Sequence, residues 1–238
     1  MTGGHHLTKV HFLVFSQAFK EGAVGLEERR KREKDNRKNA ILKAARKLFF
    51  DKGFKHVTVE SIAKKAELSK GSVYLYFQSK EEIYTQILLN DIDKFHKAID
   101  GLIREGQSAS EAIMSLANIY AGFFLNDREL FRIMMNYMLN ISHMNLPEDL
   151  DQQLVKATNK SVGIIEEIFR MGIASGEFPP YIDLREKRNA IWGLLNGTIS
   201  LHLFTGSEEK REERIRATIQ TGVNTFLRGM RTPVREVS

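Results

Sequence analysis

The sequence of 238 residues contains no cysteine and only four prolines. Without cysteine the chain has no disulfide, no thiolate nucleophile and no cysteine-ligated zinc, which fits a reducing compartment. No apolar run approaches the roughly 20 residues of a membrane-spanning helix. The nearest, VHFLVF at residues 10–15, is too short and poorly flanked for a signal peptide. We therefore expect a soluble protein of the cytoplasm with no membrane partner.

Motifs that carry enzymatic chemistry are also missing. The sequence has no HExxH segment, no glycine-rich phosphate loop and no paired acid and base. His5 and His6 are adjacent in a loose tail, where such a pair is usually incidental. The other histidines are scattered without the spacing of metal ligands: His11, His56, His96, His143 and His202. We expect neither an enzyme nor a bound metal or cofactor.

The charge that is present is unevenly distributed. The whole chain carries a net charge of +6, yet residues 27–80 alone contain sixteen Lys and Arg against seven Asp and Glu. A basic segment attached to a mildly acidic remainder is typical of a nucleic-acid binder. Charge alone fits a solvated charged helix equally well, so this observation does not decide between the two.

Apolar residues recur at helical spacing along most of the chain. The first strongly patterned helix ends before Gly53, which occupies the usual position just past a helix. A later helix is expected to begin at Lys80 and run through Glu105, and four or five further helical blocks follow it. No segment alternates as a strand does, so we predict an all-α fold.

Two short helices behind the first long one predict a helix-turn-helix. Thr58 can cap the first of them, although Ser61 rather than Glu or Gln stands three residues later, so a full capping box is not expected. Ser69 can cap the second. Four apolar residues are expected to face inward: Ile62, Ala63, Val73 and Phe77. The remaining outer face offers hydroxyls, a lysine and a glycine, as a helix in the major groove requires.

The segments AILKAARKLFFDKGF (40–54) and TVESIAKKAELSKGSVYLYFQSKEEIY (58–84) resemble the tetracycline-repressor (TetR) family of bacterial regulators. The resemblance implies contacts with phosphates and base edges from one set of residues: Thr58, Ser69, Lys70, Gly71, Ser72, Tyr74, Tyr76 and Lys80. The sequence departs from the family at Glu67, where a turn glycine is frequent. If Glu67 adopts a positive φ, the cost is about 1 kcal/mol.

The central helices are rich in large, adaptable side chains that can line a pocket for an apolar or amphipathic effector. The candidates are Phe123, Phe124, Phe131, Met134, Met135, Tyr137, Met138 and Trp192. Polar candidates beside them are Asn118, Tyr120, Asn136, Asn140 and His143. A stripe of Met and Phe is equally typical of plain core, so the residues alone leave both interpretations open.

Two heads double the DNA contacts of one, so we expect a homodimer on a palindromic site. Of the last two long helices, the first has small residues at three- and four-residue spacing, which allow close helix approach, and the second has an apolar stripe. The predicted interface comprises Ala190, Gly193, Leu194, Gly197, Leu201, Ile215, Ile219, Val223 and Phe226. The alternative is that these helices only close the core of their own protomer. The resemblance to the TetR family favours the dimer.

The expected organisation has four segments. Residues 1–34 form a flexible extension, 35–81 a three-helix helix-turn-helix domain, 82–230 a larger helical effector-binding and dimerisation domain, and 231–238 a tail. KEG at 20–22 can be encoded by a purine-rich ribosome-binding sequence, which makes Val24 a candidate GTG start. The predicted function is a ligand-responsive transcriptional regulator of double-stranded DNA, a repressor released by a small hydrophobic effector. The alternative is an architectural or partner-regulated DNA-binding protein without an effector.

Overall fold

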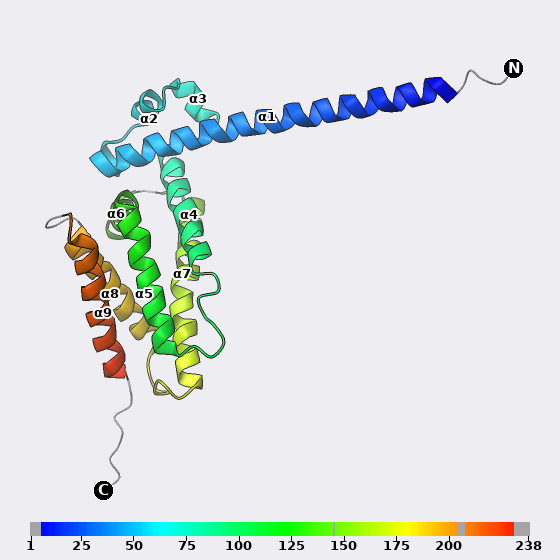
Figure 1. Ribbon diagram of the computed structural model, residues 1–238. Helices are drawn as coiled ribbons and strands as arrows, with labels where there is room; N and C mark the ends of the chain where they lie inside the picture. Colours follow the sequence, from blue (N-terminus) through cyan, green and yellow to red (C-terminus); the bar gives the residue numbers. More distant parts are fainter. Residues whose placement is uncertain (1–5, 145, 204–207, 231–238) are drawn as a thin grey trace, which may run out of the picture.

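The computed structural model describes residues 6–144, 146–203 and 208–230, with side chains from residue 27 onward except those of 140–143. Over these ranges the chain is helical and contains no strand, which confirms the predicted all-α class. A small head caps one end of an elongated helical body, and the first helix projects far beyond the head (Figure 1). Along the described chain, no helix combines the length and apolar character needed to cross a bilayer.

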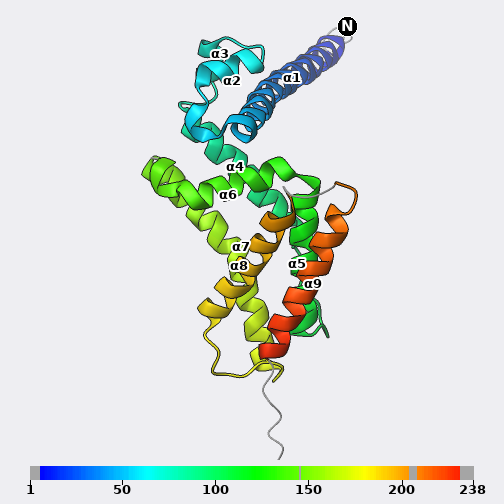
Figure 2. The same ribbon diagram turned by 90° about the vertical axis from the view of Figure 1, so that its left-hand side faces the viewer.

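The head contains the end of α1, a short 3₁₀ turn and two short helices: α1 (His6–Lys52), η1 (Phe54–His56), α2 (Val59–Lys65) and α3 (Lys70–Tyr74). The body contains six longer helices: α4 (Lys80–Ala98), α5 (Ala109–Asn126), α6 (Arg128–Met144), α7 (Glu148–Ala174), α8 (Leu184–Leu203) and α9 (Arg211–Met230). Five helices therefore follow α4, within the predicted four or five blocks. Helix α6 lies across the end of the bundle beneath the head (Figure 2).

The amino-terminal extension is helical rather than irregular. Residues 6–34, predicted as part of a flexible segment, continue α1 without a break. The run from Glu27 to Asn39 consists largely of Glu, Lys and Arg, which favour helix, and it contains no proline. Its side chains from Glu27 to Arg37 are exposed, so nothing packs against this part of α1. The flexibility of the extension stays a prediction, and residues 1–5 and the tail 231–238 lie outside the described residues.

Helix α4 is shorter than predicted. It ends at Ala98 and is capped by Ile99, whose backbone N–H donates to the carbonyl of Phe95. Gly101, with a φ of 67°, turns the chain in the left-handed region immediately afterwards. An apolar pattern that continues to Ile103 hides this break, because Leu102 packs in the core from a turn rather than from a helix.

The head and the body share a hydrophobic core. One buried cluster combines Ile41 and Phe49 of α1 with Val73 of the head, and extends to Ile133 of α6 and Leu154 of α7. A second cluster fills the centre of the body. The Tyr84 ring of α4 meets Phe49 and Phe54 edge-on, each at 5.0 Å between centroids. Residues on both sides of the boundary predicted near residue 81 therefore pack in the same hydrophobic core.

Candidate nucleic-acid interface and ligand cavity

The turn of the helix-turn-helix is a left-handed cap at the end of α2. Glu67 has a φ of 56°, as the sequence suggested. The N–H of Glu67 donates to the carbonyl of Lys64 at 3.2 Å, and that of Leu68 donates to Ala63 at 2.9 Å. This pair of bonds is the Schellman arrangement, in which glycine usually occupies the left-handed position. The turn that sets α3 across α2 thus places a carboxylate-bearing residue where a side chain is disfavoured.

Both short helices have side-chain caps. Thr58 Oγ1 accepts from the N–H of Ser61, and the N–H of Thr58 donates to Ser61 Oγ, each at 3.1 Å. The capping box is therefore complete, and the expectation that it would be incomplete is wrong. The Ser61 hydroxyl accepts the N–H of the capping residue, as a Glu carboxylate or a Gln carboxamide does in the usual capping box. In α3, Ser69 Oγ accepts from the N–H of Ser72 at 3.0 Å.

Most of the residues predicted to contact DNA are solvent-accessible, and their contacts with DNA stay a prediction. Four of them are exposed at the starts of α2 and α3: Thr58, Ser69, Lys70 and Gly71. Tyr74 is 47% exposed, whereas Ser72 and Tyr76 are half-buried and Tyr76 also packs against the core. Val73, between them, is fully buried and anchors α3.

Lys80 differs from the exposed residues predicted to contact DNA. Its ammonium donates to the carbonyls of Phe54 and Val57 at 3.1 and 3.2 Å, and it lies 4.4 Å from the centroid of the Phe54 ring. These two hydrogen bonds hold the Lys80 ammonium at the carbonyls of η1 and its cap, next to the start of α4. The phosphate contact of Lys80 stays a prediction. The spacing of residues in the sequence does not show that the Lys80 ammonium reaches the carbonyls of Phe54 and Val57.

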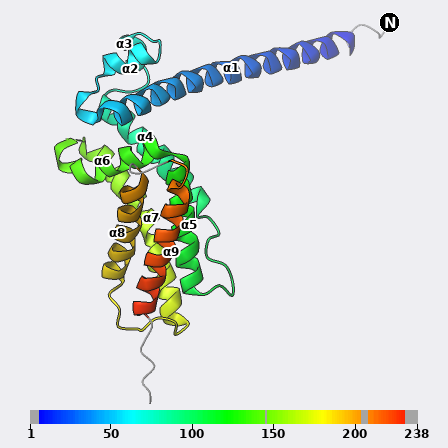
Figure 3. The ribbon, with the colours of Figure 1, turned by 60° about the vertical axis from the view of Figure 1, so that its left-hand side comes forward.

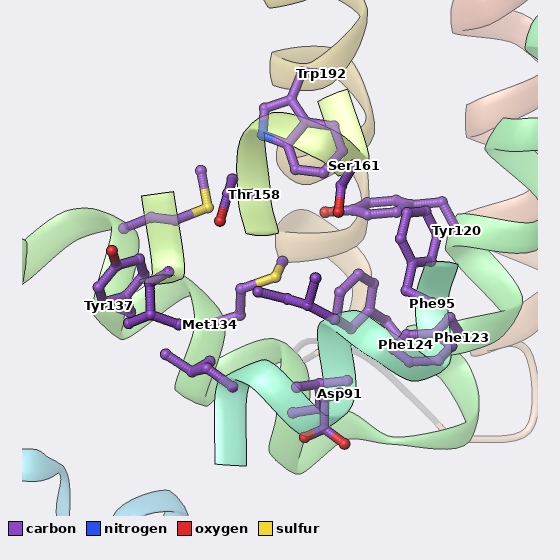
Figure 4. Close-up of a pocket in the computed structure, with 15 residues that line it drawn as sticks. Asp91, Phe95, Tyr120, Phe123, Phe124, Met134, Tyr137, Thr158, Ser161 and Trp192 are labelled. Atoms are coloured by element: carbon purple, nitrogen blue, oxygen red, sulfur yellow. The ribbon is translucent and has the colours of Figure 1, made fainter. Parts of the chain in front are cut away.

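An apolar cavity lies in the body directly below the head (Figure 4). The space open to the centre of a water molecule is about 60 Å³. Six of the predicted pocket residues line it: Phe123, Phe124, Met134, Tyr137, Met138 and Trp192. The other two do not. Phe131 is fully buried against Phe124, at 5.0 Å between ring centroids, and Met135 packs on the core beside it.

The sequence missed the walls that α4 and α7 contribute, and one residue of α6. The missed residues are Leu88, Asp91, Ile92 and Phe95 of α4, Leu154, Thr158 and Ser161 of α7, and Leu130 of α6. On α4 the signal was present, since Leu88, Ile92 and Phe95 recur at four- and three-residue spacing. Of the polar candidates only Tyr120 lines the cavity. Asn118 is exposed, Asn136 lies partly buried elsewhere on α6, and the side chains of Asn140 and His143 fall outside the described residues.

Polar groups at the cavity wall are largely turned away from it. The Tyr120 hydroxyl donates to Asn196 Oδ1 at 2.8 Å, and the Asn196 amide donates to the carbonyl of Trp192 at 2.9 Å. Burial raises the pKa of Tyr120 well above its usual range, so the hydroxyl stays a neutral donor. Burial, and then the Asp151 carboxylate, raises the pKa of Tyr137 to about 12. The space inside therefore suits an apolar group.

The polar pair Ser161 and His96 lies between the cavity and the protein surface. Ser161 lines the cavity, and its hydroxyl lies 2.8 Å from Nε2 of His96. On its other side His96 borders a more open groove that includes Lys160. Burial, and then the positive charge of Lys160, lowers the pKa of His96. This pair separates the apolar interior from the polar surface.

A charged network links the cavity wall to the head. Asp91 of α4 is 2% exposed and borders the cavity, but its carboxylate turns away from the aromatic side chains (Figure 4). It accepts from Nη1 of Arg46 in α1 at 2.9 Å and from Lys94 at 2.7 Å. Arg46 also pairs with Asp127, which precedes α6, and lies 3.9 Å from Glu129. One guanidinium thus connects the head with two walls of the cavity.

The predicted dimer residues fall into two groups. On α8, Ala190, Gly193, Gly197 and Leu201 are exposed along one face, and Leu201 is 61% exposed. On α9, Ile215, Ile219 and Val223 are completely buried in the core of the protomer. These three cannot face a partner, so that stripe of the predicted interface is corrected to internal core. The half-buried Leu194 and Phe226 pack against the core. A Cβ on Gly222 would lie only 3.2 Å from the Leu194 side chain, so the glycine allows the close pairing of α8 and α9 (Figure 3).

An exposed polar helix presented by a capped helix-turn-helix, on an all-helical body, defines a DNA-binding transcriptional regulator. Residues 41–87 match the model of the bacterial regulatory proteins of the tetR family. The match spans the helix-turn-helix head and the first part of α4.

Relatives agree with this assignment. The fatty acid metabolism regulator protein of Bacillus subtilis (strain 168) is 28% identical over 160 residues, which cover 67% of this chain and 80% of the relative. The fatty acid degradation regulator FadR of Bacillus halodurans has a similar fold, with a TM-score of 0.68 and 21% identity over 82% of this chain and 96% of that one. FadR from Bacillus subtilis, solved in complex with stearoyl-CoA, superimposes with a TM-score of 0.65 and 22% identity, over 80% and 97% of the two chains.

Proposed function

We propose that this protein is a repressor that binds a palindromic operator as a homodimer and is released by a small hydrophobic or amphipathic effector. The observation that carries the proposal is the apolar cavity bordered by α4, the helix that also begins beneath the DNA-binding head. DNA is read by α3, and the regulator acts in the cytoplasm, where a bacterial regulator meets its DNA. The regulation of DNA binding, rather than an enzymatic reaction, is the activity proposed.

The effector we propose is a long-chain fatty acyl compound. Aromatic and methionine side chains surround the cavity, and no charged group points into it among the labelled side chains (Figure 4). A long alkyl chain gains about 0.8 kcal/mol for each buried CH₂ in such surroundings. The names of the relatives support the same class, since one regulates fatty acid metabolism and another was solved with stearoyl-CoA.

A long acyl chain does not fit the cavity without movement. The open space of about 60 Å³ holds only a few water-sized molecules, whereas ligand pockets commonly measure about 300–1,000 Å³. Met134 and Met138 of α6 are the adaptable side chains on the wall. Filling the cavity therefore displaces α4 and α6 relative to one another, and this displacement is what distinguishes the two states of the regulator.

The displacement reaches DNA through Asp91 and Arg46. Moving α4 or α6 separates the carboxylates of Asp91 and Asp127, which Arg46 of α1 now holds together. The heads of the two protomers then change their separation. A coupling free energy of about 1–3 kcal/mol is typical of such switches, and an effector provides it only by binding the displaced state more tightly.

The dimer is proposed to form through the exposed face of α8. Ala190, Gly193 and Gly197 leave its backbone accessible, and Leu201 adds an exposed apolar side chain. Small residues at this spacing allow a second helix to approach closely, and a two-fold axis there repeats the contact. The operator is then palindromic, because the two α3 helices are related by the same axis.

Trp192 makes the proposal directly testable. It is the single tryptophan of the chain and borders the cavity, so its fluorescence reports ligand entry. Titration with stearoyl-CoA is expected to change this fluorescence and to release the protein from an operator obtained by duplex selection, whereas CoA alone does neither. A regulator that binds the duplex but responds in neither assay, to stearoyl-CoA or to a panel of hydrophobic ligands, has no such effector. That outcome supports the architectural or partner-regulated alternative.

A further inference from the structure

The exposed part of α1 carries a basic face that continues the DNA-binding side of the head. Arg30, Lys34 and Arg37 precede Ile41 at spacings of four, three and four residues. On an α-helix these spacings place all four side chains on one face. Ile41 is fully buried in the cluster that contains α2 and α3 residues. The three basic residues therefore continue, along α1, the face through which Ile41 packs into the core of the head.

Lys38, beside this face, is the last basic residue before Ile41 and contacts the head. Its ammonium lies 5.6 Å from the centroid of the Phe77 ring, in the segment that follows α3. Farther along, α1 leaves the head behind and projects alone, as both Figure 1 and Figure 3 show. Arg30 lies about 16 Å beyond Ile41 along the helix axis, at about 1.5 Å per residue. The basic face thus extends the head in one direction by about half of a 34 Å turn of duplex.

The charges of this face are available to a partner. Arg30, Lys34 and Arg37 are exposed, and no ion pair to any of them occurs among the residues described. The acidic residues of the same stretch lie mainly elsewhere: Glu33 pairs with Arg29 at 3.2 Å, and Glu28 and Asp35 lie near the opposite side. Glu27 and Glu33 lie at the two edges of the basic face, about 50° and 70° from its centre on a helix of 3.6 residues per turn.

We propose that the basic face of α1, formed by Arg30, Lys34 and Arg37, binds the phosphate backbone of duplex flanking the half-site read by α3. The inference rests on the proposed DNA binding and adds a second contact surface to it. Duplex DNA carries one negative charge per about 1.7 Å of its axis, which complements a row of guanidinium and ammonium groups. The contact carries no base specificity. It adds affinity, salt dependence and length to the footprint.

The experiment compares two charge-matched variants. R30Q/K34Q removes two charges from the proposed face, and R29Q/R32Q removes two from the other sides of the same helix. Glutamine favours helix, and far-UV circular dichroism checks that both variants keep their helical content. Each is titrated over a range of salt concentration with one duplex, a selected operator flanked by 15 added base pairs on each side.

The expected result is a smaller salt slope for R30Q/K34Q only. Each lost phosphate contact lowers the slope of log K against log salt by about 0.9. Trimming the flanking base pairs is expected to reduce the slope of the unmodified protein toward that of R30Q/K34Q, and to leave that variant unchanged. Equal slopes for the two variants on the long duplex overturn the proposal.

Two further outcomes are distinguishable. If R30Q/K34Q binds duplex normally but loses binding to phosphatidylglycerol vesicles, the face belongs to an anionic membrane surface and the proposal is overturned. If the unmodified protein binds no duplex from the selection, the proposed DNA-binding function itself fails, and the variants need not be compared. A selective effect of R30Q/K34Q on long duplex alone supports the proposal.

Discussion

Arg46 of α1 and Asp91 of α4 form a largely buried ion pair, with side chains 17% and 3% exposed and 2.9 Å between Nη1 and Oδ2. The pair joins the helix that supports the DNA-binding head to the wall of the apolar cavity. Because both charges are removed from water, the pair is costly to break by removing one partner. Substitutions in this pair are therefore expected to change both the free energy of unfolding and the coupling between the cavity and the head.

Replacing Arg46 with Met is expected to lower the free energy of unfolding by about 3 kcal/mol, since Asp91 then stays buried with only Lys94 as a cationic partner. Urea denaturation followed by circular dichroism measures the change. The double variant R46M/D91N is expected to recover part of the loss. If the two single changes simply add, the residues are not coupled.

Replacing Lys70 with Gln is expected to weaken DNA binding without changing stability. Lys70 is exposed at the start of α3, and loss of one phosphate contact lowers the salt slope by about 0.9 for each head. Electrophoretic mobility or fluorescence anisotropy at several salt concentrations gives the slope. Lys43→Gln, which removes an exposed lysine of α1 outside α2 and α3, serves as the control. An identical slope for both variants would remove Lys70 from the interface.

Replacing Glu67 with Gly is expected to stabilise the protein by about 1 kcal/mol, because glycine adopts the left-handed φ of 56° without the clash that a Cβ causes. Thermal and chemical denaturation report the gain. Lys64→Gly, one turn earlier within α2, is expected to destabilise by about 1 kcal/mol instead. A loss of stability in E67G would mean that the Glu67 side chain makes a contribution greater than its strain.

Stability is expected to fall as the pH drops below the ordinary pKa of histidine, about 6.5, and His96 contributes to this fall. Its pKa is lowered in the folded protein by burial and by Lys160, so the unfolded chain binds the proton first and the folded state loses its advantage as pH decreases. H96Q is expected to flatten the dependence of unfolding free energy on pH between neutral and weakly acidic conditions. H56Q, at an exposed histidine in η1, is the control substitution.

Local signals predicted the head well because its folding information is local. Thr58, Ser69 and Gly53 stand at helix ends where their side chains or backbone freedom are needed, and each occupies the predicted position. The all-helical class follows from apolar spacing in the same way. The unpredicted completion of the capping box by Ser61 shows how closely such local rules depend on backbone distance.

Contacts between distant segments could not be predicted from spacing. Arg46 lies 45 residues from Asp91, and Lys80 reaches back to Phe54 and Val57 across the turn rather than outward. The apolar stripe of α9 has the same period whether it forms a dimer interface or part of the core. In the structure it is buried against α5 and α8, an arrangement that depends on how all the helices of the body pack together. Phe131 and Met135 were misplaced for the same reason, since a helix with apolar residues on several faces does not indicate which of them border a cavity.

The shared core has a consequence for building hybrids of this regulator. Val73 of α3 belongs to the same buried cluster as Ile133, Tyr137 and Leu154 of the body, and the Tyr84 hydroxyl donates to the carbonyl of Ile133 at 2.6 Å. A head exchanged at residue 81 would leave apolar surface from both parents mismatched. A working chimera with a new DNA specificity therefore has to transplant only the outward residues of α3, or carry α4 and α6 along with the head.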